Sequence, residues 1–294
     1  MDVVRFKGGL GNQMFQYAFL KSLEHRGRMA GASLGFYDEY PDSRKFELDR
    51  VFPNIRMDTG FDKEFFEAYN KWNLIKSDSK KLEDFKRDLK NRYFWSEADD
   101  EVGRYQAEVY LTENCVFAGY WQTEKYFTEI RKELLSDLRF LNGAGDQRLE
   151  ALGQQFLEHD NYVSVHVRRG DYLQFSEMYG NICKEQYYQA AMEYINQRFS
   201  SPVFVFFSDD IEWVKGHYGN ADSIYVEAGM FEEYQSWYDM YLMSCCSHNI
   251  VANSTFSWWG AWLNEREEKL VIAPKKWMNI LNMTDICPKT WIRL

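Results

Sequence analysis

Short apolar runs alternate with longer amphipathic stretches along the chain, a pattern that predicts strands connected by helices. In the first half, residues 2–7 are typical of a strand, and a tight glycine turn follows at 8–13. Residues 14–25 then carry apolar side chains at helical spacing. Residues 62–92 are also helical in pattern, and their charges of both signs are typical of a solvated helix face.

The alternation is more regular in the second half. Strands are predicted at 162–167, 202–207, 249–252 and 270–274, and helices at 184–199, at 234–243 and directly after Ser254 or Thr255, either of which suits a helix cap. Strands that alternate with helices favour an α/β fold with parallel sheets. The glycine-containing stretch 141–145 predicts a division into two such units, 1–145 and 146–294.

Polar residues follow four of the predicted strands. They are Gly8–Gln13, Arg168–Asp171, Ser208–Asp210 and Asn253–Thr255. Ligands of open α/β sheets bind beyond the carboxyl ends of the strands, so these segments predict a site for a polar ligand.

The individual residues allow more than one interpretation. Arg168 and Arg169 suit the oxygens of a phosphate group, but they also suit surface ion pairs. Asp209 and Asp210 fit a divalent metal ion, although capping of the next helix is the more frequent role of such a pair. His166 is typical of a hydrogen-bonded structural residue, and its neighbour Arg168 strengthens a functional hypothesis.

Composition narrows the class of protein. Hydrophobic residues make up 45% of the chain and aromatic residues 18%, which is typical of a globular protein and excludes a disordered one. The net charge of -10 argues against general nucleic-acid binding. No stretch is long and apolar enough for a membrane span. The five cysteines lack metal-ligand spacing, so we expect free thiols and a cytoplasmic location, with peripheral contact to the inner membrane left open.

Five motifs together are more specific than any one of them. They occupy residues 8–17, 119–127, 166–172, 207–210 and 253–260, in that order. This arrangement resembles the α-1,2-fucosyltransferases of glycosyltransferase family 11, of bacterial type. The resemblance extends from residue 3 to about residue 275.

The resemblance implies a GT-B-like fold with two Rossmann-type units facing a cleft. Unit 1–145 would be the acceptor side and unit 146–294 the GDP-fucose-binding side, with the last helix free to return to the first unit. The donor would be GDP-β-L-fucose, and no metal or other cofactor would be required. The reaction would invert the anomeric centre and link fucose to the 2-hydroxyl of a terminal β-galactose, as in lactose.

The resemblance also implies roles for individual residues. Arg168 would hold the β-phosphate, and Asn12 would face the diphosphate or the fucose; these two are the expected catalytic residues. Further donor contacts would come from Gly11, Gln13, His166, Arg169, Asp209, Asp210, Asn253, Ser254, Thr255 and Phe256. The catalytic base stays open, with Asp171 and Glu124 as weak candidates and a dissociative transition state that needs little base as the alternative.

Three further functions compete with this one. The first is that of a metal-dependent sugar-nucleotide transferase that uses Asp209 and Asp210. The second is that of a carbohydrate-binding protein that stacks sugars on Trp258, Trp259 and Trp262, although these tryptophans are more typical of a helix core. The third is that of an enzyme like the protein O-fucosyltransferases, which share the arginine and G-N motifs.

Overall fold

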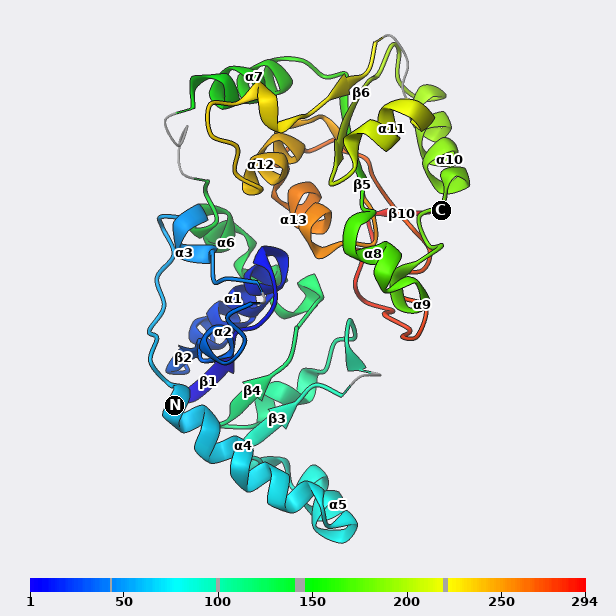
Figure 1. Cartoon of the computed structure of the whole chain (residues 1–294). Coiled ribbons are helices and arrows are strands. Elements are labelled where there is room, and N and C mark those ends of the chain that lie inside the picture. Colours follow the sequence, from blue (N-terminus) through cyan, green and yellow to red (C-terminus); the bar gives the residue numbers. More distant parts are fainter. Residues whose placement is uncertain (43, 99–100, 141–145, 219–221) are drawn as a thin grey trace. The chain divides into compact units, whose positions relative to one another are not determined.

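The computed structural model describes the chain except for residues 43, 99–100, 141–145 and 219–221. The chain divides into two compact units (Figure 1). Unit 1 comprises Met1–Arg139 and Met283–Ile286, and unit 2 comprises Phe140–Asn282 and Cys287–Leu294. The chain thus leaves unit 1 between Arg139 and Phe140, just before the predicted division. The segment that returns to unit 1 is a turn and not a helix.

Unit 1 is built on a four-stranded parallel sheet in the order β2-β1-β4-β3. Its strands are β1 (Asp2–Arg5), β2 (Ala30–Ser33), β3 (Phe94–Ser96) and β4 (Val116–Ala118). β1 lies between two neighbours and is almost entirely buried, and its two central valines supply apolar side chains to the core.

The helix that follows β1 begins earlier than its apolar pattern predicts. α1 (Leu10–His25) starts directly after Gly9, which has extended backbone and serves as the N-cap. The glycine turn therefore ends at Gly9, and Gly11, Asn12 and Gln13 belong to the first turn of the helix. The remaining α-helices of unit 1 are α2 (Phe36–Glu39), α3 (Leu48–Val51), α4 (Asp62–Lys76), α5 (Ser79–Arg87) and α6 (Arg131–Asp137).

The predicted helix at 62–92 is two helices, α4 and α5. The break lies at Asp78, whose carboxylate accepts hydrogen bonds from the backbone N–H groups of Lys80 and Lys81 at 3.1 and 3.2 Å. This side chain caps α5 and satisfies donors that a helix start otherwise leaves unpaired. Short 3₁₀ turns follow at η1 (Leu89–Asn91), η3 (Ala107–Leu111), η4 (Glu124–Tyr126) and η5 (Thr128–Ile130).

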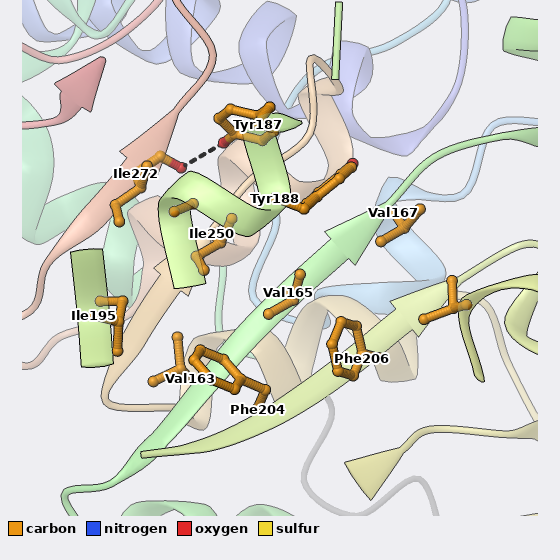
Figure 2. Packing of buried hydrophobic residues seen from close by; sticks show 12 residues of the cluster. Val163, Val165, Val167, Tyr187, Tyr188, Ile195, Phe204, Phe206, Ile250 and Ile272 are labelled. Carbon is orange, nitrogen blue, oxygen red and sulfur yellow. Dashed lines mark hydrogen bonds between the residues drawn. The ribbon is translucent and has the colours of Figure 1, made fainter. Parts of the chain in front are cut away.

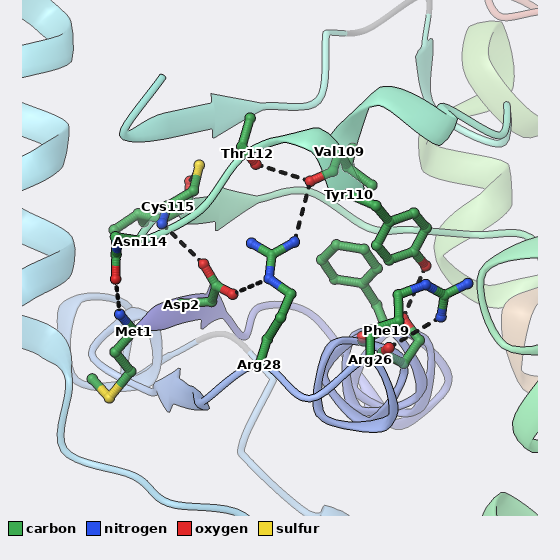
Figure 3. A network of polar contacts seen from close by, with 12 residues as sticks. Met1, Asp2, Phe19, Arg26, Arg28, Val109, Tyr110, Thr112, Asn114 and Cys115 are labelled. Carbon is green, nitrogen blue, oxygen red and sulfur yellow. Dashed lines mark hydrogen bonds and ion pairs between the residues drawn. The ribbon is translucent and has the colours of Figure 1, made fainter. Parts of the chain in front are cut away.

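A buried ion pair holds the beginning of β1 (Figure 3). Oδ2 of Asp2 lies 2.5 Å from Nε of Arg28, and Oδ1 accepts the backbone N–H of Cys115 at 3.0 Å. Asp2 therefore links the start of β1 to the segments that lead into β2 and β4. A charge buried in this way needs such partners, because an unpaired buried carboxylate is costly.

Unit 2 is built on a six-stranded parallel sheet in the order β10-β9-β8-β5-β6-β7. Its strands are β5 (Tyr162–Val167), β6 (Val203–Ser208), β7 (Ile224–Tyr225), β8 (His248–Ile250), β9 (Val271–Ala273) and β10 (Ile292–Arg293). All four strands predicted in this half are present. Two parallel sheets with connecting helices confirm the predicted α/β fold class.

The helices of unit 2 include the three that the sequence predicts, as α10, α12 and α13. The full set is α7 (Gln147–Glu158), α8 (Gly170–Gln174), α9 (Ser176–Tyr179), α10 (Glu185–Asn196), α11 (Ile211–Tyr218), the 3₁₀ turn η6 (Ala228–Met230), α12 (Trp237–Cys245) and α13 (Thr255–Leu263).

The core of unit 2 fixes the register of the adjacent strands β5 and β6 (Figure 2). Alternate residues of β5 and β6 pack under α10, and all of them are at most 5% exposed: Val163, Val165, Val167, Phe204 and Phe206. The hydroxyl group of Tyr187, on α10, donates a shared hydrogen bond to the carbonyl oxygens of Val251 at 2.6 Å and Ile272 at 3.1 Å, and thereby ties the helix to the end of β8 and to β9. Burial of one of these valine or phenylalanine side chains stabilises the folded state by about 1.5–3 kcal/mol.

The tryptophans of α13 belong to a core. Trp258, Trp259 and Trp262 are 0–2% exposed. The interpretation as helix core is therefore confirmed, and the hypothesis of a sugar-stacking surface on these side chains is wrong. A ring that is buried in the folded chain presents no face to a sugar.

Asp239 on α12 carries a buried carboxyl oxygen and is not one of the predicted site residues. Its Oδ1 has no hydrogen-bond partner among the described residues. Burial raises its pKa to about 7, while a hydrogen bond with Tyr234 acts in the opposite direction. The folded protein therefore retains a proton that an unfolded aspartate releases near pH 4.

We predict that this proton makes stability depend on pH. As pH rises from about 4 to 7, the unfolded state gains the free energy of ionisation and the folded state does not, so stability falls over this range. Asp239→Asn removes the titration. Its advantage in melting temperature over the wild type should be small at pH 5 and should grow up to pH 8. A difference that stays constant over this range would contradict the prediction.

Candidate functional site

The parallel register of β5 and β6 places Arg168 beside Asp209. Val167 lies opposite Ser208 at the last paired position, so the next residue of each strand emerges at the same level of the sheet edge. There, Nη1 of Arg168 lies 2.9 Å from Oδ2 of Asp209, and both side chains are 25% exposed. Because pairs near the surface contribute no more than about 1 kcal/mol, the main effect is to orient the guanidinium group.

Arg169 is held in the same way one residue further on. Its Nε lies 3.0 Å from Oδ2 of Asp210, and its guanidinium group lies 3.7 Å from the ring centroid of Trp213. Oδ1 of Asp210 accepts the backbone N–H of Trp213 at 3.3 Å and so also binds the first turn of α11. A carboxylate and an indole face therefore fix Arg169 from two sides.

These contacts show what the two aspartates do in the folded chain. Each carboxylate is paired with an arginine, and Oδ1 of Asp209 also accepts the backbone N–H of Arg169 at 2.9 Å. Gly170 leaves room for this arrangement, because a Cβ atom there would lie 2.6 Å from Oδ2 of Asp209. Among the described residues, no group of three or more His, Cys, Asp or Glu side chains is placed to hold a metal ion.

His166 lies on β5 and is 6% exposed. Burial lowers its pKa to about 3, and the positive charge of Arg168 adds to the shift, so the imidazole is neutral at physiological pH. Its Nδ1 has no hydrogen-bond partner among the described residues. Its ring centroid lies 6.0 Å from that of Phe256, which links the edge of β5 to the start of α13.

The segment after β8 leads into α13 at the same edge of the sheet. Oγ of Ser254 accepts the backbone N–H of Phe256 at 3.3 Å and caps the helix, and Thr255 is its first residue. The amide of Asn253 is 3% exposed and donates to the carbonyl oxygen of Trp277 at 3.1 Å. The N-terminus of a helix favours anions, so this arrangement suits a phosphate group.

In unit 1, the residues predicted to face the donor lie just after β1. Gly8 has a φ of +80°, and a Cβ atom there would lie 2.6 Å from Nδ2 of Asn12. Nε2 of Gln122 donates to Oδ1 of Asn12 at 2.9 Å. The glycine and the glutamine together fix the orientation of the Asn12 side chain.

Gln13 is fully buried and holds the loop together. Its Nε2 donates to the carbonyl oxygens of Gly8 and Lys45 at 3.0 and 2.8 Å, and its Oε1 accepts the backbone N–H groups of Glu47 and Leu48 at 2.9 and 3.2 Å. All four hydrogen bonds of the amide are therefore made within unit 1. A contribution of Gln13 to donor binding would act through the shape of this loop.

The sequence gives no reason to single out Gln16 and Gln122, although both lie within the motifs. Gln16 is also fully buried, and its amide bonds to both backbone groups of Lys7 and to the carbonyl oxygen of Gly119. It connects the end of β1 to the end of β4. Hydrogen bonds of Gln122 and Gln16 thus connect the motif 119–127 to the residues on either side of the glycine turn.

In its described part, the structure supports neither of the two weak candidates for a catalytic base. Glu124 begins η4 in unit 1. Asp171 lies in α8, and its side chain lies outside the described part of the structure.

The predicted residues thus form two groups. One contains Gly11, Asn12 and Gln13 in unit 1, and the other contains His166, Arg168, Arg169, Asp209, Asp210 and the segment 253–256 in unit 2. Each group lies at the carboxyl end of a parallel sheet, where α/β proteins bind phosphorylated ligands. In the part of the chain that the structure describes, no helix is long and apolar enough to cross a membrane.

Comparison with known proteins identifies the family. The family model "Glycosyl transferase family 11" matches residues 67–294. An α-1,2-colitosyltransferase of Escherichia coli is 34% identical over 99% of this chain and 98% of its own length. The chain therefore belongs to glycosyltransferase family 11.

Other relatives span different shares of the chain. The O-antigen biosynthesis glycosyltransferase WbnK of Escherichia coli is 31% identical over 98% of both chains. The human galactoside α-(1,2)-fucosyltransferase 1 is 30% identical over 47% of this chain and 40% of its own length. Among solved structures, the α-1,6-fucosyltransferase NodZ, co-crystallised with GDP, matches 88% of this chain and 91% of its own with a TM-score of 0.48 and 17% identity.

We predict that Asp209→Asn lowers glycosyl transfer more than it lowers nucleotide binding. The change removes the carboxylate that orients Arg168 but leaves the guanidinium charge in place. A small misplacement of such a group costs up to about 100-fold in rate, so kcat should fall about 10- to 100-fold while GDP binds at least as tightly. Glu212→Gln, which removes an exposed negative charge paired with Lys215 on α11, is the matched control. Equal kcat values for the two variants would contradict the prediction.

Proposed function

We propose that this protein transfers L-fucose from GDP-β-L-fucose to the 2-hydroxyl of a terminal β-galactose, with inversion and without a metal ion. The observation that carries the proposal is the arginine pair at the carboxyl ends of β5 and β6, oriented by Asp209 and Asp210. Family membership supports sugar transfer, and the human relative named as an α-(1,2)-fucosyltransferase supports the sugar and the linkage.

The chemistry of the reaction explains why oriented arginines are useful. When the bond between the sugar and the β-phosphate breaks, negative charge develops on the departing diphosphate. Fixed cations that are aimed at this charge stabilise the transition state without having to reorganise during the reaction. Arg168 would contact the β-phosphate, while the neutral His166 and the start of α13 would bind elsewhere on the nucleotide.

A specific observation favours a second donor. The relative that is 34% identical over 99% of this chain is named a colitosyltransferase. Colitose is L-fucose without its 3-hydroxyl group, so GDP-linked donors of the two sugars would differ in one polar contact. Comparing GDP-fucose with GDP-colitose therefore decides the sugar without affecting the proposed mechanism.

Three competing functions would each require something different of the site. A metal-dependent transferase would need Asp209 and Asp210 to leave their arginines and bind the ion, which would remove the orientation of the guanidinium groups. An enzyme like the protein O-fucosyltransferases would use the same donor and a protein acceptor. A carbohydrate-binding protein would release no GDP.

We predict that Arg168→Ala abolishes measurable transfer and leaves the fold intact. The side chain is partly exposed, so its loss has little effect on the core. Removal of one group that stabilises transition-state charge costs about 10²–10³-fold in rate. Arg168→Lys should fail similarly, because an ammonium group cannot form the two-pronged contact of a guanidinium group. Near-wild-type turnover by either variant, at an unchanged melting temperature, would contradict the role of Arg168.

The proposal is tested by GDP release from GDP-fucose in EDTA, with and without lactose. Lactose-dependent release, with an α-1,2 linkage found by NMR, is the expected result. Release that requires added Mn²⁺ would support a metal-dependent transferase. Release only with GDP-colitose, or only with a protein acceptor, would keep the class of reaction and replace the sugar or the acceptor.

A further inference from the structure

Glu97 is a buried carboxyl group at the carboxyl end of β3, outside the motifs that mark the predicted site. Its Oε2 accepts the backbone N–H of Tyr120 at 2.6 Å. Its Oε1 is buried and has no hydrogen-bond partner among the residues that the structure describes. An unsatisfied buried oxygen costs about 1–3 kcal/mol, so its retention calls for an explanation, and a catalytic role is one of the recognised ones.

Glu97 lies where three strands of unit 1 end. The turn that holds its Oε2 follows β4, and the ring of Tyr120 in this turn lies 4.1 Å from Nζ of Lys7, which follows β1. Two residues further, Gln122 bonds to Asn12. The carboxyl group therefore shares one edge of the sheet with a cation, an aromatic ring and two amides, which is a suitable set of groups for binding a sugar.

The turn itself is constrained to make this contact. A Cβ atom at Gly119 would lie 2.8 Å from Cβ of Glu97, so only glycine allows the approach. Trp121 has a φ of +56°, an unusual value for a bulky residue, and its ring stacks on Phe19 at 4.2 Å. Backbone strain of this kind costs about 1–3 kcal/mol and tends to occur at functional sites.

We propose that Glu97 is the catalytic base of the transfer reaction and that this edge of unit 1 binds the acceptor sugar. The proposal rests on the proposed glycosyl transfer. The acceptor oxygen attacks C1 of the donor sugar, and the bond from C1 to the β-phosphate oxygen breaks with its electron pair going to GDP. The proton of the acceptor hydroxyl moves to Oε1 of Glu97.

The surroundings of Glu97 suit a base that works near neutral pH. Burial raises its pKa to about 7, the backbone N–H groups of Tyr120 and Trp121 and the charge of Lys7 lower it, and Glu101 raises it further. Tyr120 and Tyr126 also interact with its charge, but burial raises both of their pKa values, so they stay neutral in this range.

A carboxylate with a raised pKa takes up a proton more readily than an ordinary carboxylate and still ionises within the physiological pH range. Oε1 of Glu97 is buried within unit 1. The acceptor hydroxyl would supply its missing hydrogen bond on binding, because catalytic contacts commonly form only in the substrate complex. Since the ionised form is active, the rate should rise with pH through about 7.

The test compares Glu97→Gln with the wild type. Glutamine keeps the size and, through its carbonyl oxygen, the bond to the Tyr120 N–H, but it cannot take the proton. We expect kcat to fall about 100-fold or more, the KM for the donor to stay the same, and the acid limb of the wild-type pH profile to be absent from the residual activity. Glu113→Gln, an exposed change in the same unit, should behave like the wild type.

Glu97→Asp and the wild-type pH profile keep the proposal falsifiable if the glutamine variant does not fold. Aspartate retains a carboxylate, so it should retain more activity than glutamine and keep an acid limb. A merely structural role predicts equal damage by both changes and no change in the profile. A wild-type profile that is flat between about pH 5 and 9, or near-wild-type kcat in Glu97→Gln, would overturn the proposal. Failure of the wild type to transfer sugar from either donor would instead contradict the proposed function.

Discussion

The register between β5 and β6 is the constraint on which the site of unit 2 depends. Side chains alternate between the two faces of a strand, so a shift of one residue would turn the buried valines and phenylalanines of this pair to the opposite faces. The same shift would separate Arg168 from Asp209. Packing against α10 thus determines the register, and the register determines where the arginines lie. The core and the position of the arginine edge are two results of one set of contacts.

The two units organise their strand ends by different physical means. Unit 2 uses partly exposed ion pairs, which orient cations at little energetic cost because water still solvates them. Unit 1 uses buried amides, and Gln13 and Gln16 satisfy the backbone groups of loops that could not otherwise leave water. In both arrangements, contacts within the unit itself fix the polar side chains, and fixed polar groups are what electrostatic stabilisation of a transition state requires.

Sequence patterns predict the elements with strong local signals. β5 and β6 are apolar over strand length, and the motifs mark the segments after them. The sequence therefore predicts both strands and the polar residues at their carboxyl ends. It does not predict β2, because Ala30–Ser33 contains only small residues, and the ring of Phe61 covers Gly31 in the structure. The contacts of Asp209 and Glu97 depend on residues distant in the chain, so no local pattern indicates which oxygen is paired and which is not.

The central claim is that the arginine edge of unit 2 binds the diphosphate of the donor. A crystal structure of the protein with GDP tests it most directly. We expect a β-phosphate oxygen within hydrogen-bond distance of the Arg168 guanidinium group, with the contact between Arg168 and Asp209 preserved. A β-phosphate that touches neither Arg168 nor Arg169, or a metal ion between Asp209 and the phosphate, would contradict it.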